Sequence, residues 1–220
     1  MSAAAWERTL DVRTADETHA LAAGLGAQLQ TGDLLVLTGE LGAGKTTFTQ
    51  GLGEGLGVRA GIISPTFVLV RIHPNLPDGP RPGGPDLVHV DAYRLGSASE
   101  IDDIDLENTM DSAVTVVEWG RGRVEHLSES RLEVDLLRSL GGGTHSPEAR
   151  APEENPRMAA PQDPDVLDFD TDDDDEPRTI VIRGFGPRWV DPPVLSSPAS
   201  FAAPAGSAET ATPPHSLEGN

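Results

Sequence analysis

The sequence predicts a single α/β layer fold, and three observations support this prediction. Apolar runs of strand length alternate with stretches of helical periodicity, which is the pattern of a sheet covered by helices. A glycine-rich motif at 39–46 joins one such run directly to a helical stretch. About 140 residues remain outside three proline-rich or acidic segments, which is the size of one ordinary domain.

The N-terminal part carries four expected elements. Thr14 and Glu17 form a capping box, in which the hydroxyl accepts from a first-turn amide and the carboxylate reaches back. Leu21, Leu25 and Leu29 then fall on one face of the helix that follows. The expected elements are a strand over 6–12, a helix from 15, a buried strand over 33–38 and a helix from about 45 to 56.

The remaining elements continue the alternation. Ser97 and Glu100 form a second capping box at the start of a short acidic helix. Segments 131–137 and 179–183 alternate apolar and polar residues, so we expect them to pair with each other. Strands are expected over 67–72, 87–90, 113–117, 131–137 and 179–183.

Three segments hold too little apolar surface to offset the entropy of ordering them, and we expect them to be flexible or disordered. Residues 73–86 contain five prolines and three glycines, and residues 141–177 contain twelve acidic residues against two arginines. Residues 191–220 contain six prolines and neither lysine nor arginine. The predicted organisation is a core over 1–140 with a flexible insert at 73–86, an acidic disordered insert at 141–177, a final core strand within 178–190 and a disordered tail over 191–220.

The formal net charge of −20 and the absence of cysteine exclude several classes of function. An acidic chain does not attract phosphate backbones, so we do not expect a stand-alone DNA- or RNA-binding protein. Without cysteine there is no thiol catalysis, disulfide or cysteine-ligated zinc. Residues 1–10 lack a basic region followed by an apolar core, and no apolar stretch approaches the ~18 residues of a membrane span. We therefore expect a cytoplasmic protein with no membrane partner.

Residues 39–46 match the phosphate-binding pattern GxxxxGK[ST] in full, between a strand and a helix. Glycines let successive backbone amides turn toward a phosphate, and the helix N-terminus adds its dipole. Lys45 would supply a compact charge to the outer phosphates, and the Thr46 hydroxyl can ligate Mg²⁺. Lys45 is the one lysine of the chain, so the second lysine of a guanine-reading NKxD motif is missing and ATP is the expected nucleotide. The motif predicts a P-loop NTPase-like layered fold.

Two of the expected strands end in carboxylates. The strand over 87–90 is followed by Asp91, and the strand over 113–117 is followed by Glu118. Ligands bind at the carboxyl ends of strands in an open α/β sheet. Asp91 would hold the water shell of Mg²⁺, and Glu118 would assist the metal or orient the attacking water. The alternatives are a turn aspartate and a solvated loop glutamate.

Four residues near these carboxylates leave alternatives open. Thr66, within Ser-Pro-Thr-Phe, stands where a hydroxyl can sense the γ-phosphate, or it only forms a turn. Tyr93 either packs in the core or contacts phosphate, and Trp119 either packs or serves as a ligand platform. His89 alternates with two valines along its strand and is expected to be half-exposed.

Four motifs in register, over about residues 6–140, resemble the bacterial TsaE (YjeE) family: GELGAGKTTFTQGLGEGLG, SPTF, HVDAYRL and VEWG. The resemblance implies a P-loop fold with a central mixed sheet. It also implies binding of ATP and Mg²⁺, with slow hydrolysis activated by the partner proteins TsaD and TsaB. The implied role is in threonylcarbamoyladenosine (t6A) modification of tRNA, with the tRNA contacted only indirectly.

The same resemblance implies a role for individual residues. Thr46, Asp91 and Glu118 would hold Mg²⁺, while Thr66, Asp91 and Glu118 would act in hydrolysis. Thr47 would extend the loop toward the α-phosphate. The nucleotide would be bound by Glu40, Leu41, Gly42, Ala43, Gly44, Lys45, Thr46 and Thr47.

Two other functions remain open. A small-molecule kinase would need an arginine-bearing lid, for which Arg121 and Arg123 are the clustered cations near the expected site. A nucleotide-gated binding module would have negligible turnover, and Glu118 would then have no role in hydrolysis.

Overall fold

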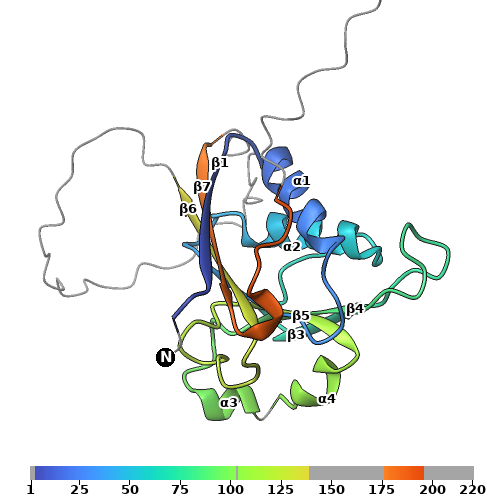
Figure 1. The fold of residues 1–220 in the computed structure, drawn as a ribbon. Coiled ribbons are helices and arrows are strands. Elements are labelled where there is room, and N and C mark those ends of the chain that lie inside the picture. Colours follow the sequence, from blue (N-terminus) through green and yellow to red (C-terminus); the bar gives the residue numbers. More distant parts are fainter. Residues whose placement is uncertain (1–2, 103, 139–175, 196–220) are drawn as a thin grey trace, which may run out of the picture.

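The structure is a computed structural model that describes residues 3–102, 104–138 and 176–195 (Figure 1). The strands are β1 (Trp6–Val12), β2 (Leu34–Thr38), β3 (Val70–His73), β4 (Asp86–Asp91), β5 (Ala113–Glu118), β6 (Arg131–Arg138) and β7 (Arg178–Phe185). The helices are α1 (Ala15–Gly26), α2 (Lys45–Leu56), α3 (Ala98–Asp102) and α4 (Glu107–Met110), followed after β7 by the 3₁₀ turn Pro187–Trp189. Within these residues, no helix is long and apolar enough to cross a membrane.

The strands form one seven-stranded sheet in the order β1-β7-β6-β2-β5-β4-β3. The four central strands β6, β2, β5 and β4 are parallel. β1, β7 and β3 pair antiparallel with their neighbours. The predictions of an α/β fold with a mixed sheet, and of pairing between the two segments that flank the acidic insert, are therefore confirmed.

Two apolar layers cover the sheet. α1 and α2 pack on one face (Figure 1). There Leu25 and Phe48 belong to one core cluster with Leu35 and Leu37 of β2. Residues of the segment that contains α3 and α4 pack on the other face, against Leu34 and its alternating neighbours. β2 is therefore buried on both faces, which is why its sequence is a continuous apolar run.

The two helices of the first layer approach each other backbone to backbone. A Cβ atom added at Gly51 would overlap the carbonyl oxygen of His19, and one added at Gly55 would overlap that of Ala23. α2 can therefore lie this close to α1 only because its contact face carries glycine. At the N-terminus of α1, the Thr14 hydroxyl accepts a hydrogen bond from the Glu17 amide at 3.1 Å, as the capping box predicted.

The strand predicted over 67–72 is wrong in its first half. Residues 65–69 form a turn in which the amides of Val68 and Leu69 both donate to the carbonyl of Pro65. Leu69 has a left-handed backbone with φ of 68°. β3 therefore starts only at Val70, and Phe67 is left exposed.

Residues 73–86, expected to be flexible, have defined contacts with the helix ends. Asn75 Nδ2 donates to the carbonyl of Leu56 at 2.9 Å, at the end of α2. Arg81 Nη1 donates to the carbonyl of Gly26, the last residue of α1, at 3.4 Å, and its Nη2 donates to the carbonyl of Leu29 beyond the helix at 2.8 Å. The last carbonyls of a helix lack partners within the helix, so these side chains satisfy groups that would otherwise need water.

The tail expected over 191–220 begins with a docked segment. Val194 exchanges two hydrogen bonds with the side chain of Gln28, at 2.8 and 2.9 Å. Most of the acidic insert (141–175) and of the tail (196–220) lies outside the described residues. The final core segment contains β7 and the buried side chain of Trp189.

Candidate functional site

The phosphate-binding loop connects β2 to α2 at the carboxyl edge of the parallel strands. Gly42 and Gly44 have φ of 77° and 95°, in the left-handed region that favours glycine. No side chain caps the N-terminus of α2, so its first amides are available to an anion. The loop therefore has the backbone form and the free amides that phosphate binding requires.

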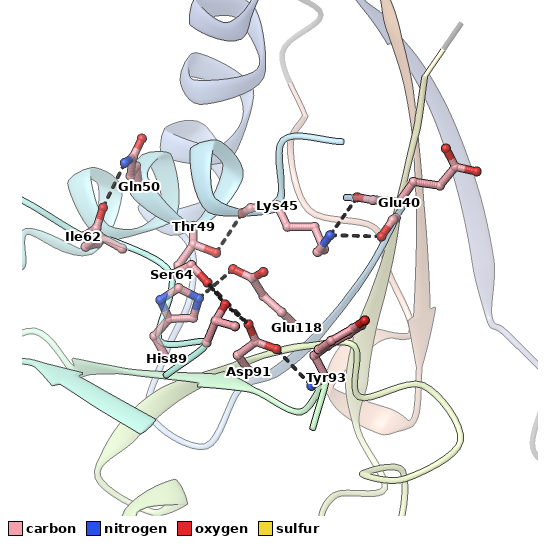
Figure 2. A network of polar contacts seen from close by, with 12 residues as sticks. Glu40, Lys45, Thr49, Gln50, Ile62, Ser64, His89, Asp91, Tyr93 and Glu118 are labelled. Atoms are coloured by element: carbon pink, nitrogen blue, oxygen red, sulfur yellow. Dashed lines mark hydrogen bonds and ion pairs between the residues drawn. The ribbon is translucent and has the colours of Figure 1, made fainter. Parts of the chain in front are cut away.

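Lys45 is held inside this loop. Its Nζ donates to the carbonyls of Gly39 and Glu40, at 2.9 Å each (Figure 2). The same atom lies 4.1 Å from the centre of the Trp119 ring. Burial lowers the pKa of Lys45, while the nearby carboxylates of Glu118 and Asp91 act in the opposite direction. The ammonium is thus positioned by carbonyl dipoles and an aromatic face in the free protein.

Asp91 connects the end of β4 to the turn after α2. Its Oδ2 accepts a hydrogen bond from Thr66 Oγ1 at 2.6 Å and a longer one from Ser64 Oγ at 3.3 Å (Figure 2). Its Oδ1 accepts from the amide of Tyr93 at 2.9 Å. The bond to the Tyr93 amide is the one expected of an aspartate that only forms a turn. The same carboxylate also contacts the Ser-Pro-Thr-Phe segment, so Asp91 does more than form a turn.

Glu118 lies beside Asp91 because β4 and β5 are parallel and these two residues are register partners. Its side chain is 3% exposed, so the alternative of a solvated loop glutamate is wrong. Oε1 of Glu118 lies 2.8 Å from Nε2 of His89. His89 is fully buried, and the expectation that it is half-exposed is also wrong, because α2 covers this face of β4.

Most of the predicted residues line one cavity of about 340 Å³. Glu40 lies outside this lining, in an adjoining cavity between the loop and β6, and Ala43 is buried in the core beneath the loop. Trp119, with a left-handed φ of 61°, lines both cavities, so it is not confined to core packing. The first cavity is lined by Leu41, Gly42, Gly44, Lys45, Thr46, Thr47, Ser64, Thr66, Asp91, Glu118 and Trp119.

The residues present fit a magnesium nucleotide. Mg²⁺ prefers hard oxygen ligands and is usually held by one or two carboxylates together with substrate phosphates. Thr46, Asp91 and Glu118 supply a hydroxyl and two carboxylates around the cavity. Among the described residues, no group of three or more histidine, aspartate or glutamate side chains could hold a metal alone. This donor set therefore leaves coordination positions for phosphate oxygens and water.

Two arginines beside the loop were not anticipated. Arg138 Nη2 lies 3.1 Å from the place a Cβ of Gly42 would occupy, and Arg178 Nε lies 3.6 Å from that of Gly44. They come from the facing ends of β6 and β7, so their proximity depends on the pairing of these strands and not on any local motif. In the sequence, only the alternation of apolar and polar residues over 131–137 and 179–183 points to the pairing that brings these arginines to the loop.

The two arginines proposed for a kinase lid lie elsewhere. Arg121 forms ion pairs with Asp135 and Glu133 on β6. Arg123 donates to the carbonyls of Ala92 and Trp119. Neither belongs to the lining of the cavity around Lys45.

Known proteins are similar to this chain over more than half of its length. The family model described as "Threonylcarbamoyl adenosine biosynthesis protein TsaE" matches residues 12–142. The chain is 45% identical over 166 residues to the protein of that name from Streptomyces coelicolor, covering 75% of this chain and 88% of the relative. It is 40% identical over 125 residues to the one from Bacillus subtilis, covering 56% and 73%. The crystal structure of YdiB from Bacillus subtilis superposes with a TM-score of 0.55 at 25% identity, covering 86% of this chain and 92% of that one.

Proposed function

The chain belongs to the TsaE family, and from this premise we propose that it is an ATPase subunit needed for t6A modification of tRNA. It binds ATP with Mg²⁺, hydrolyses it slowly and is stimulated by the partner proteins TsaD and TsaB. The observation that carries the proposal is the placement of Lys45, Thr46, Asp91 and Glu118 around one cavity.

The loop binds the phosphates. Its free amides and the N-terminal end of α2 face the anion. Lys45, which donates to the carbonyls of Gly39 and Glu40 in the free chain, exchanges these carbonyls for phosphate oxygens. Mg²⁺, held by Thr46 and the two carboxylates, would neutralise charge on the phosphates when bound.

The two carboxylates have separate tasks. Oε1 of Glu118 is already engaged by His89, so Oε2 is the oxygen left to assist the metal or to orient the attacking water. Asp91 holds the water shell of the metal and stays bonded to the Thr66 hydroxyl. Through that bond, the Ser-Pro-Thr-Phe segment senses what happens at the phosphates.

Partners hold the tRNA. The chain carries 36 acidic residues against 16 basic ones, and such a surface repels a phosphate backbone. A more basic partner therefore binds the RNA, while this chain contributes the nucleotide-driven step. Tight, Mg²⁺-independent retention of tRNA by the isolated chain in a filter-binding assay would contradict this division.

The test is phosphate release by the full chain with and without the TsaB–TsaD pair. We expect stimulation by the pair, and Glu118→Gln should abolish the stimulated release while sparing ATP binding. No stimulation of the wild type would overturn the proposed function.

The same variant separates an enzyme from a nucleotide-gated binding module. In a module without turnover, Glu118→Gln leaves phosphate release unchanged. Arg121 and Arg123 do not support the kinase alternative, because both are engaged away from the cavity.

A further inference from the structure

We propose that His89 is a positioning residue that fixes the carboxylate of Glu118 for its work at the nucleotide site. This inference rests on the proposed function. It adds a residue, His89, that lies outside the lining of the nucleotide cavity. The cavity lining includes Glu118 but not His89, so the imidazole acts through the carboxylate and not on a ligand.

The contact is short and buried. Nε2 of His89 lies 2.8 Å from Oε1 of Glu118, and the two side chains are 0% and 3% exposed. His89 lies two residues before Asp91 on β4, and its register partner Val116 lies two residues before Glu118 on β5. Side chains two residues apart on a strand share a face, so His89 stands one step behind the pair of carboxylates. Figure 2 shows the imidazole pointing at the carboxylate.

Packing does not explain a histidine at this position. Its Nδ1 is buried and has no hydrogen-bond partner among the described residues. A buried polar atom without a partner is unfavourable, and a leucine would fill the same space without leaving one. Leu87, two residues earlier on the same face, is such an apolar core residue. The bond from Nε2–H to Glu118 is the contact that a histidine makes here and an aliphatic side chain does not.

The main chain around Glu118 is already fixed by hydrogen bonds, so the His89 imidazole restrains the side chain of Glu118. The carbonyl of Glu118 accepts from the amide of Ala92 at 2.9 Å, and the next amide donates to Leu37 at 3.0 Å. Beyond the backbone, a glutamate still has three rotatable bonds before its carboxylate. Engaging Oε1 removes that freedom and leaves Oε2 for a ligand. Loss of a partner that orients a metal-site ligand costs about 10–100-fold in metal affinity or activity.

Four variants of the full chain test this. His89→Leu removes the donor, His89→Gln places an amide nitrogen at the reach of Nε2, and His89→Asn places it too short. His73→Gln is the matched control, because His73 lies on the adjacent strand with its ring 6.3 Å from that of His89. For each, the measurements are thermal unfolding, affinity for a non-hydrolysable ATP analogue with and without Mg²⁺, and kcat and KM of TsaB–TsaD-stimulated phosphate release.

We expect His89→Leu and His89→Asn to lower kcat about 10–100-fold and to reduce the gain in analogue affinity that Mg²⁺ confers. Affinity for the analogue without Mg²⁺ stays near the wild-type value, because Lys45 and the loop are unaltered. His89→Gln and His73→Gln retain most of the wild-type kcat. In a Glu118→Gln background, where stimulated release is absent, His89→Leu should have little further effect on the Mg²⁺-dependent gain in analogue affinity, since residues that act as a unit are not additive.

Equal kcat in His89→Gln and His89→Asn would overturn the inference. So would a loss of Mg²⁺-dependent analogue affinity on His89→Leu that is as large in the Glu118→Gln background as in the wild type. If His89→Leu does not fold, the comparison of the two amide variants still decides. An active wild type with unaffected His89 variants refutes the inference alone. A wild type without stimulated release refutes the proposed function, and the Mg²⁺-dependent affinity then still tests whether His89 orders the metal ligand.

Discussion

Replacing Lys45 with alanine should remove nucleotide binding and leave the free protein folded. In the free chain its ammonium donates to the carbonyls of Gly39 and Glu40, which line a cavity where water can replace it. Burial lowers the pKa of Lys45, so below that pKa the folded chain holds the charge less favourably than the unfolded chain does. Loss of the two Lys45 hydrogen bonds lowers the free energy of unfolding, whereas removal of the buried ammonium raises it, so the two effects oppose each other. We expect the free energy of unfolding to change by less than about 1 kcal/mol.

With nucleotide present the difference becomes large. Two hydrogen bonds from the ammonium to phosphate oxygens are worth at least about 3 kcal/mol, or ~150-fold in affinity. At free ATP 100 times above the dissociation constant, binding stabilises the wild type by about 2.7 kcal/mol and the variant by about 0.3 kcal/mol. For a chain of this length, the wild-type Tm should rise by ~5–11 °C and that of Lys45→Ala by ~1 °C.

The assay is thermal unfolding followed by circular dichroism, with and without ATP and Mg²⁺. Arg8→Ala, on the exposed side of β1, is the control and should keep the full ATP-dependent rise. A Lys45→Ala protein that gains as much from ATP as the wild type would refute the site. A variant that is unfolded without ATP would show that the side chain serves the core.

Three further changes have defined outcomes. Gly51→Ala should lower the free energy of unfolding in urea by roughly 1–3 kcal/mol, because its Cβ overlaps α1, whereas Gly24→Ala, with nothing within 4 Å, should not destabilise. Thr66→Val should lower kcat for stimulated phosphate release about tenfold through loss of its bond to Asp91, while Thr66→Ser keeps the rate; equal rates in the two variants would exclude a role for the hydroxyl. Joining β6 to β7 by a short turn in place of 141–175 should preserve folding and ATP-dependent stabilisation, because the two strands pair to their facing ends; loss of a cooperative thermal transition would contradict this.

The phosphate-binding loop could be predicted because its determinants are local. The positive φ angles fall on Gly42 and Gly44, and α2 runs from Lys45 to Leu56 as the sequence indicated. Motif, flanking strand and helix all lie within a few residues of one another. The local sequence therefore predicts both the bounds of α2 and most of the loop residues that line the cavity.

The contacts of His89 and of the 73–86 segment could not be predicted in the same way. His89 and Glu118 are 29 residues apart and meet only because β4 and β5 pair in one particular register. The composition of residues 73–86 shows that the segment has little apolar surface. The contacts that hold the segment come instead from polar side chains that reach the helix ends. Such bonds leave no periodic pattern, so composition alone points to flexibility.

The glycine contact between α1 and α2 has a mechanical consequence. Because a Cβ at Gly51 or Gly55 would overlap the backbone of α1, the two helices touch backbone to backbone, and we expect α1 to follow a displacement of α2. Asn75 and Arg81 then fasten the far ends of both helices to one strap. The first turn of α2, beside the phosphate-binding loop, lies about 18 Å from this end of the helix, so we expect a displacement of α2 by phosphate to reach residues 73–86 through both helices together.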